Sequence, residues 1–435
     1  MNILSKFKLI SCEVGPNYQL DDALVAKLSL LNIFGIGQSS AMKWCASWFR
    51  SYLNLNAQDK LLFTDNGRTS LYLILKSLNF ASQSEVLIQT FSCAVLPNSV
   101  WQAGLTPILC DVDQDNYNFD LEKLQSKITS KTKAIVVQYT FGIVPDMQKI
   151  VEFCQKNKLV LIEDCAHSLG ATTTINGQQV KVGSIGQAAF FSFGRDKIVS
   201  TTIGGVGLFN SQNLIDSSLD FSLLNKTFQK NYDHLPHLKT VRVAQALLYA
   251  IINPVFVRPL YHFVLGKVIL LLSRKLRLFS EIYTPKEKLG TNSLETNSKY
   301  SLGLASLLKH QLQKFEKLNS HRRELAQIYA KGLGLDYFEN NVYMRFVIDF
   351  KKLSSATDYK QNYLKTYKKL RQNRVLPGTW YKSFFQPNID LAKFNSKLDD
   401  FPVAATLCDN RILNLPTNIN VSKEQAQRLV ELILK

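Results

Sequence analysis

Residues 159–209 constrain the fold of this chain more than any other stretch. A short apolar run ends on two carboxylates, the second being Asp164, and about thirty residues later another apolar run ends near Ser192 and Lys197. Such runs predict strands that are buried on both faces of a sheet. Because the carboxyl ends of parallel strands line the ligand crevice of an open α/β sheet, we expect the acid and the amine to meet there. An aspartate, a lysine and a nearby hydroxyl suit the cofactor pyridoxal phosphate (PLP).

Strand and helix signals alternate through the first half of the chain. The predicted strands cover residues 85–89, 106–112, 134–139 and 159–164, and the predicted helices between them cover residues 94–103, 121–128 and 145–156. The strands are rich in Val, Ile and Leu and lack polar alternation, which is typical of strands covered on both sides. A doubly wound, mostly parallel sheet is the predicted architecture.

The composition indicates a globular protein of a reducing compartment. The 435 residues, of which 46% are hydrophobic, can fill one large α/β domain and a smaller one. The seven cysteines are odd in number and form no C-x-x-C pair, so we expect neither disulfides nor a metal site, and a cytoplasmic location. The N-terminus has no signal-peptide pattern, and no uncharged apolar run reaches the roughly 20 residues of a spanning helix.

Four motifs follow one another with a characteristic spacing. They are NGRTSL (66–71), QTFSCAV (89–95), EDCAHSLGA (163–171) and SFGRDK (192–197). Their order resembles that of the DegT/DnrJ/StrS family of PLP-dependent nucleotide-sugar aminotransferases, and the resemblance covers residues 60–210 and 291–435. It implies the fold-type-I PLP transferase architecture. In that architecture, residues 1–295 would form a large α/β domain with a mostly parallel sheet flanked by helices, and residues 296–435 a smaller C-terminal α+β domain.

The resemblance implies catalytic roles for two residues. Lys197 would be the Schiff-base lysine and would afterwards act as the base that moves a proton between substrate and cofactor. Asp164 would face the pyridine nitrogen, because an ionised carboxylate keeps that nitrogen protonated and the ring electron-poor. Both residues would also bind the cofactor.

The resemblance also implies cofactor contacts for Gly67, Arg68, Phe91, His167, Ser192 and Asn297. Gly67, Arg68 and Ser192 would bind the phosphate, and Phe91 would stack on the ring. Asn297 would reach the phosphate of the partner subunit in a homodimer. More ordinary roles stay open: a plain helix N-cap at residues 66–70, a core phenylalanine at 91 and a structural histidine at 167.

The function implied by the resemblance is transamination of a keto-sugar, nucleotide-linked in the family's manner, to an amino sugar for glycan biosynthesis, with glutamate as amino donor. A sugar dehydratase of the same family has histidine at the lysine position, so Lys197 argues against that activity. Two positions depart from the family pattern, Ile203 for Glu and Tyr139 for His, and we expect them to alter substrate handling. The alternative is a non-catalytic, membrane-associated scaffold or regulator that retains the fold.

Residues 211–290 lie outside the resemblance and form a predicted insertion. From residue 234 to residue 280 there is no Asp or Glu and there are seven Lys or Arg, in a chain of net charge +18. Apolar helices with basic flanks are typical of segments that lie on an anionic membrane surface, here the inner face of the membrane. Packing against the sheet or in a dimer is the alternative. Nucleic acid is not an expected partner, because the basic residues lack aromatic platforms and groove-reading motifs.

Overall fold

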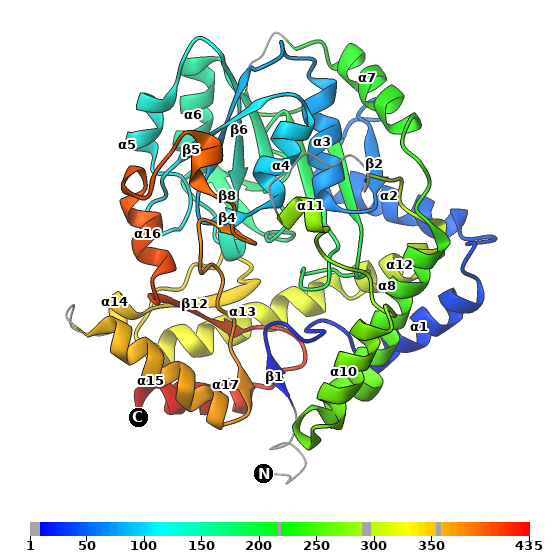
Figure 1. The fold of residues 1–435 in the computed structure, drawn as a ribbon. Helices are drawn as coiled ribbons and strands as arrows, with labels where there is room; N and C mark the ends of the chain where they lie inside the picture. The colour runs from blue at the N-terminus through cyan, green and yellow to red at the C-terminus, as the bar shows by residue number, and fades with distance from the viewer. Residues whose placement is uncertain (1–8, 216–218, 289–296, 354–357) are drawn as a thin grey trace.

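A seven-stranded sheet forms the centre of the larger part of the molecule (Figure 1). The computed structural model describes residues 9–215, 219–288, 297–353 and 358–435. The sheet order is β2 (Leu61–Thr64), β11 (Gly205–Phe209), β10 (Ala188–Ser192), β7 (Val160–Asp164), β6 (Thr132–Gln138), β3 (Glu85–Gln89) and β5 (Thr106–Cys110). All of these strands except β11 run in one direction. The predicted mostly parallel sheet is confirmed.

The strands β7 and β10 lie side by side and run in parallel, with Asp164 in register with Phe190. Every residue of β7 is buried, and so are the first four residues of β10. Burial on both faces explains why these segments contain no polar residues until their ends. The groups that follow the two strands therefore emerge at the same edge of the sheet.

Helices cover both faces of the sheet, because alternate strand residues point to opposite sides. Leu87 belongs to one hydrophobic core and its neighbours Val86 and Ile88 belong to the other. The first core is closed by α2 (Ser39–Leu53) and α6 (Met147–Asn157), and the second by α3 (Gly67–Ser77) and α4 (Val95–Gln102). This arrangement leaves the strand ends open for a site.

A smaller unit packs below the sheet in Figure 1. It contains the antiparallel pair β12 (Arg345–Asp349) and β15 (Ile412–Pro416) and the helices α13 (Phe315–Leu333), α15 (Tyr359–Gln372) and α17 (Lys423–Leu434). The N-terminal strand β1 (Ile10–Ser11) pairs with β13 (Val375–Leu376) of this unit. Conversely, Phe385 and Phe401 pack in a core of the larger part. The chain thus crosses between the two units several times, and the division at residue 295 stays a prediction.

The insertion consists mainly of helices, some of which lie beside α1 (Leu20–Leu31). They are α7 (Phe221–Asp233), α8 (Thr240–Ile252), a π-helical turn (Asn253–Val257), α10 (Leu265–Lys275) and α11 (Pro285–Lys288). The helix α8 packs on α1 and buries Val243, Ala246 and Leu247. Arg258 donates hydrogen bonds to the carbonyls of Leu9 and Val14. The insertion is therefore joined to the N-terminal segment.

Residues Thr240–Phe263 form a helical stretch that is long and apolar enough, on length and composition alone, to cross a membrane. Arg242 and Arg258 interrupt it, so it contains no uncharged run of spanning length. Within its most apolar window, 44% is buried inside the protein. Core helices of soluble proteins pass the same test, so this stretch does not decide between core and membrane.

Candidate active site

A cavity of about 380 Å³ opens where β7 and β10 end. Six of the eight predicted site residues line it: Gly67, Arg68, Asp164, His167, Ser192 and Lys197. They come from α3, from the ends of two neighbouring strands and from the loops that follow these strands. The cavity thus gathers an amine, a carboxylate, a hydroxyl and a helix N-terminus.

Lys197 lies in the turn that follows β10. Its N–H donates to the carbonyl of Gly194 at 3.1 Å, and its ammonium nitrogen is 5.7 Å from the ring centroid of Trp380. Burial lowers the pKa of Lys197, against the opposing effect of the negative charges of Asp164 and Asp196. A lowered pKa leaves more of the amine neutral, which is the form that attacks a carbonyl.

Asp164 ends β7 and is 7% exposed. Its Oδ1 accepts a hydrogen bond from the N–H of Ala166 at 3.0 Å. Burial raises the pKa of Asp164 to about 6, although the Ala166 bond and the charge of Lys197 oppose that rise. A cationic ring nitrogen in the cavity would lower this pKa again and hold the carboxylate ionised.

The N-terminus of α3 and the hydroxyl of Ser192 form a cradle for an anion. Asn66 caps the helix, because its Oδ1 accepts a hydrogen bond from the N–H of Thr69 at 2.9 Å. Gly67 and Arg68 come before Thr69 in the first helical turn, where backbone N–H groups have no acceptor within the helix. A Cβ on Gly67 would lie 3.1 Å from the Cβ of Ser192. Glycine therefore lets the helix start approach Ser192 closely, as a bound phosphate requires.

His167 is buried and stacks on Trp380, with ring centroids 5.7 Å apart and planes at 22°. Its Nδ1 accepts from the N–H of Phe141 at 3.3 Å. Burial and the positive charges of Lys197 and Arg345 hold the pKa of His167 well below 6.5, so the ring is neutral. The sequence-based prediction assigns no role to Trp380. The one feature of the sequence that could have indicated it is the pair of aromatic residues at 380–381.

Phe91 and Asn297 do not line the cavity. Phe91 is fully buried and makes a T-shaped contact with Tyr381, which does line it. Asn297 lies beside the first turn of α3 of the same chain. There, its Oδ1 accepts a hydrogen bond from the hydroxyl of Thr69 at 3.1 Å. Its Nδ2 is buried and has no partner within the described part of the chain. The roles predicted for these two residues stay predictions.

The side chain of Arg68 is held away from a phosphate role. It forms an ion pair with Glu287 and donates to the carbonyl of Ile282 at 2.7 Å. Its backbone N–H remains at the N-terminus of α3, so the predicted phosphate contact rests on that group. The guanidinium instead joins α3 to the end of the insertion.

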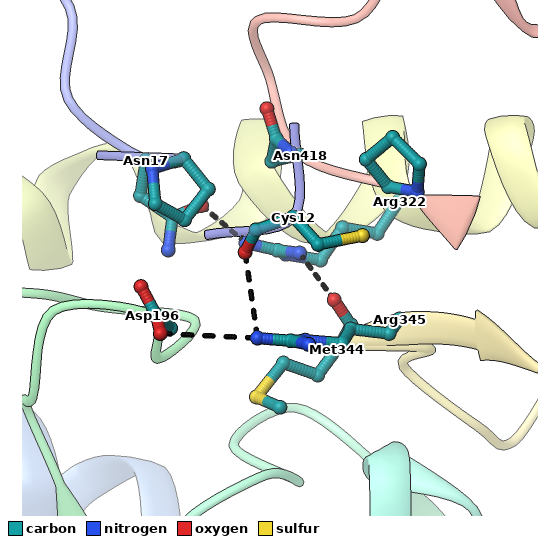
Figure 2. Close-up of a pocket in the computed structure, with 9 residues that line it drawn as sticks. Cys12, Asn17, Asp196, Arg322, Met344, Arg345 and Asn418 are labelled. Atoms are coloured by element: carbon teal, nitrogen blue, oxygen red, sulfur yellow. Dashed lines mark hydrogen bonds and ion pairs between the residues drawn. The ribbon is translucent and has the colours of Figure 1, made fainter. Parts of the chain in front are cut away.

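The N-terminal segment holds the backbone of Lys197 in place. The amide of Asn17 donates to the carbonyl of Lys197 and accepts from the guanidinium of Arg322. Asn17 and Arg322 border a small cavity of about 10 Å³, in which Asp196 faces Arg345 at 3.8 Å (Figure 2). The guanidinium of Arg345 also lies 3.5 Å from the ring centroid of Trp380. This buried polar cluster supports the loop that carries the lysine.

The two departures from the family pattern lie in different surroundings. Tyr139 is fully buried outside the cavity lining, and its hydroxyl donates to Glu163 at 2.5 Å. Glu163 also accepts from the N–H groups of Gly183, Ile185 and Gly186 at 2.7–2.8 Å. Tyr139 thus belongs to a structural network. Ile203, in contrast, lines the cavity.

The residues of this cavity fit PLP. The cradle of α3 and Ser192 suits its phosphate, the buried carboxylate of Asp164 suits its ring nitrogen, and the amine of Lys197 suits its aldehyde. The stacked rings of His167 and Trp380 supply a flat wall for an aromatic ligand.

Known proteins resemble this chain in sequence. It is 31% identical over 169 residues to a GDP-perosamine synthase of Vibrio cholerae, covering 39% of this chain and 45% of the relative. It is 40% identical over 130 residues to a dTDP-3-amino-3,6-dideoxy-α-D-galactopyranose transaminase of Aneurinibacillus thermoaerophilus, covering 29% and 34%. The matched region thus spans less than half the length of either relative.

Solved structures resemble the chain over almost its whole length. An aminotransferase of Psychrobacter cryohalolentis gives a TM-score of 0.68 at 20% identity and covers 96% of both chains. The PseC aminotransferase of Helicobacter pylori, involved in pseudoaminic acid biosynthesis, gives 0.66 at 18% and covers 97% of this chain and 98% of its own. These likenesses confirm the predicted fold-type-I architecture. A model of the DegT/DnrJ/EryC1/StrS aminotransferase family matches residues 48–236 and 272–434, and the chain belongs to this family.

Proposed function

We propose that this protein is a PLP-dependent aminotransferase that converts a nucleotide-linked keto-sugar to an amino sugar, with glutamate as amino donor, in glycan biosynthesis. The observation that carries the proposal is the meeting of Lys197 and Asp164 in one cavity beside an anion cradle. The names of the relatives, which act on GDP- and dTDP-linked sugars, support the substrate class.

Bound PLP supplies an electron-poor ring that stabilises negative charge on the substrate carbon. Lys197 would hold the aldehyde, and its free amine would move a proton at the substrate carbon. Asp164 would hold the ring nitrogen protonated. The helix start at Gly67 and the hydroxyl of Ser192 would bind the phosphate, and the rings of His167 and Trp380 would orient the cofactor and exclude water.

The half-reaction with the amino donor tests this function. Protein loaded with PLP should show visible absorbance that glutamate bleaches, since the amino group passes to the cofactor. Lys197→Ala should lose this bleaching, whereas Lys267→Ala, an exposed lysine of α10, should retain it. Failure to take up PLP, or unchanged bleaching in Lys197→Ala, would refute the catalytic function and favour the scaffold alternative.

We also propose a homodimer in which Asn297 contacts the phosphate site of the partner subunit. The unpartnered Nδ2 of Asn297, buried beside Thr69, supports a role in binding an acceptor outside its own hydrogen-bond network. Light scattering should give twice the mass of one chain, and Asn297→Ala should weaken PLP binding. A monomer that binds PLP with full affinity would contradict the shared site.

We further propose that the protein is cytoplasmic and that its insertion docks on the anionic inner face of the membrane. The helix α10 exposes Leu271 (65%), and Leu276 (66%) follows its last residue, with Lys267 and Lys275 nearby in the sequence. The neighbouring α1 exposes a further helical stripe: Leu20, Leu24, Leu28 and Leu31. Apolar faces with basic flanks match an anionic bilayer in both polarity and charge.

Vesicle sedimentation tests the docking. The protein should bind vesicles that contain phosphatidylglycerol more strongly than vesicles of phosphatidylcholine, and Leu271→Glu with Leu276→Glu should abolish the binding. A protein that stays monodisperse without detergent and ignores acidic vesicles would exclude the membrane role. In that case the apolar faces would be assigned to packing between subunits.

A further inference from the structure

The insertion forms part of the wall of the candidate active site. Arg242 and Tyr249 of α8, Arg274 of α10 and residues 280–283 all line the cavity that contains Lys197. The family model leaves residues 237–271 unmatched, so Arg242 and Tyr249 stand outside the matched region, whereas Arg274 and residues 280–283 fall within it. An unmatched helix in the wall of this cavity is placed to contact a substrate there.

Two arginines from the common part of the fold fasten this wall in position. Arg195 donates to the carbonyl of Ser280, and its guanidinium lies 4.3 Å from the ring centroid of Tyr249. Arg68 holds Glu287 and the carbonyl of Ile282. The lining residues of the insertion are thus attached to the site at two points.

Arg242 and Arg274 form no ion pair with any carboxylate that the structure describes. Within the described ranges, no carboxylate lies within 4.0 Å of either guanidinium or of Arg195. The acids that act on Arg242 from a greater distance are engaged elsewhere: Asp65 accepts from Thr69 and Glu287 pairs with Arg68. The positive charge of Arg195 acts on both Arg242 and Tyr249, and that of Arg274 acts on Tyr249, so the three cations share one region.

We propose that Arg242 and Arg274, together with Arg195, bind the diphosphate group of a glycosyl diphosphate substrate. Several unpaired guanidiniums near one another repel unless an anion of more than one charge lies between them, and their planar forks match phosphate oxygens. The inference rests on the proposed function, because it assigns the substrate of the same cavity. Within that one cavity, it assigns these arginines to the substrate and leaves the cofactor phosphate to the cradle at Gly67 and Ser192.

The diphosphate is common to sugars linked to nucleotides and to sugars linked to polyprenols. Arg274 lies in the last turn of α10, next to its apolar face. The nucleoside or the polyprenol attached to the bound diphosphate could therefore extend from the cavity along this helix. The test therefore uses both kinds of probe. UDP, GDP, dTDP and farnesyl diphosphate are titrated calorimetrically into the PLP-loaded protein.

At least one of these diphosphates should bind, and the double variant Arg242→Ala, Arg274→Ala should raise its Kd about tenfold or more. The double variant Arg242→Lys, Arg274→Lys, which keeps the charges, should show a smaller loss. The control variant Lys267→Ala, Lys275→Ala removes two exposed charges of α10, the helix that carries Arg274. It should leave the Kd unchanged. Tighter binding of a nucleoside diphosphate or of farnesyl diphosphate would support the proposal and identify the carrier.

Binding of none of the four probes, or an unchanged Kd in the alanine variant, would overturn the proposal. A loss of PLP affinity in that variant would also overturn it, because the arginines would then serve the cofactor phosphate. PLP uptake is read separately from its visible absorbance. A wild-type protein that binds a diphosphate but no PLP would refute the proposed transamination and leave the diphosphate site standing.

Discussion

Asn17 lies outside the catalytic cavity, yet its amide is joined to the carbonyl of Lys197 and to the guanidinium of Arg322. Arg322 is itself held by the carbonyl of Met344 at 3.2 Å. The backbone of Lys197 is therefore fixed by a chain of buried polar contacts that begins in the smaller unit. Asn17 acts on the backbone of Lys197 and does not line the cavity, so we assign it a positioning role.

Asn17→Ala should loosen Lys197 without removing its amine. We expect glutamate to bleach the visible absorbance about tenfold more slowly or worse, and the pH midpoint of that absorbance to shift, since a misplaced reacting group costs rate steeply. Asn420→Ala is the matched control, because Asn420 binds the carbonyls of Pro16 and Tyr18 on the same segment. Equal effects of the two substitutions would show that Asn17 acts only through the fold.

At the scale of single residues, the sequence predicts those site residues that directly follow buried strands. Asp164 and Lys197 are marked by apolar runs that end in polar groups, and the structure brings both into one cavity. Asn17 carries no such mark, because it stands 180 residues from the lysine it contacts. Its role arises from a tertiary hydrogen bond, which local pattern does not encode.

Among the elements, α3 and the end of the insertion depend on each other. The ion pair of Arg68 and Glu287 joins them, and Glu287, at 1% exposure, also accepts from the N–H of Thr284 at 2.7 Å. A buried carboxylate that loses its guanidinium is left as an uncompensated charge. The cavity wall formed by residues 280–283 therefore relies on this pair.

Arg68→Met should destabilise the protein by about 3–5 kcal/mol, because Glu287 stays buried and charged. The double variant Arg68→Met, Glu287→Gln should recover much of the loss. Denaturant unfolding measures both, with Lys149→Ala of an exposed pair expected to cost below about 1 kcal/mol. A single variant as stable as wild type, or a double variant less stable than the single one, would contradict the tether.

The sequence predicts that the insertion is helical and apolar, but it does not tell which helices are covered. The helices α8 and α10 are both rich in Leu, Ile and Val, yet α8 buries most of one face against α1 whereas α10 buries only Gly266 and Ser273. Hydrophobic content is similar in both cases, and the difference arises from what packs against each helix. Arg242 and Arg274 likewise acquire a role only through the position of these helices beside the cavity.

The stability of the whole molecule depends on pH through buried carboxyl groups of the candidate site. Burial disfavours their charged form. Burial raises the pKa of Asp65 to about 7, against the lowering effects of its Thr69 bond and of the charges of Arg68 and Arg242. Burial likewise raises the pKa values of Asp164 and Asp196 to about 6. Because these values exceed those of the unfolded chain, the folded protein binds extra protons between about pH 4 and pH 7. These groups therefore stabilise the fold less as the pH rises through that window.

Asp65→Asn should raise the Tm of the cofactor-free protein more at pH 8 than at pH 5, by about 5 °C or more, since the amide carries no charge to bury. The difference between variant and wild type isolates Asp65 from the other groups whose protonation changes with pH. Asp399→Asn, at an exposed position, should give the same small change at both values. A difference that shrinks as the pH rises would contradict the assignment.

The proposed transaminase activity depends on one covalent bond, that between PLP and Lys197. Borohydride reduction of the PLP-loaded protein, followed by peptide mass mapping, tests it directly because reduction makes the link permanent. We predict the phosphopyridoxyl label on the peptide that contains Lys197, and its loss in Lys197→Ala. A label on another lysine, or none at all, would contradict the central claim.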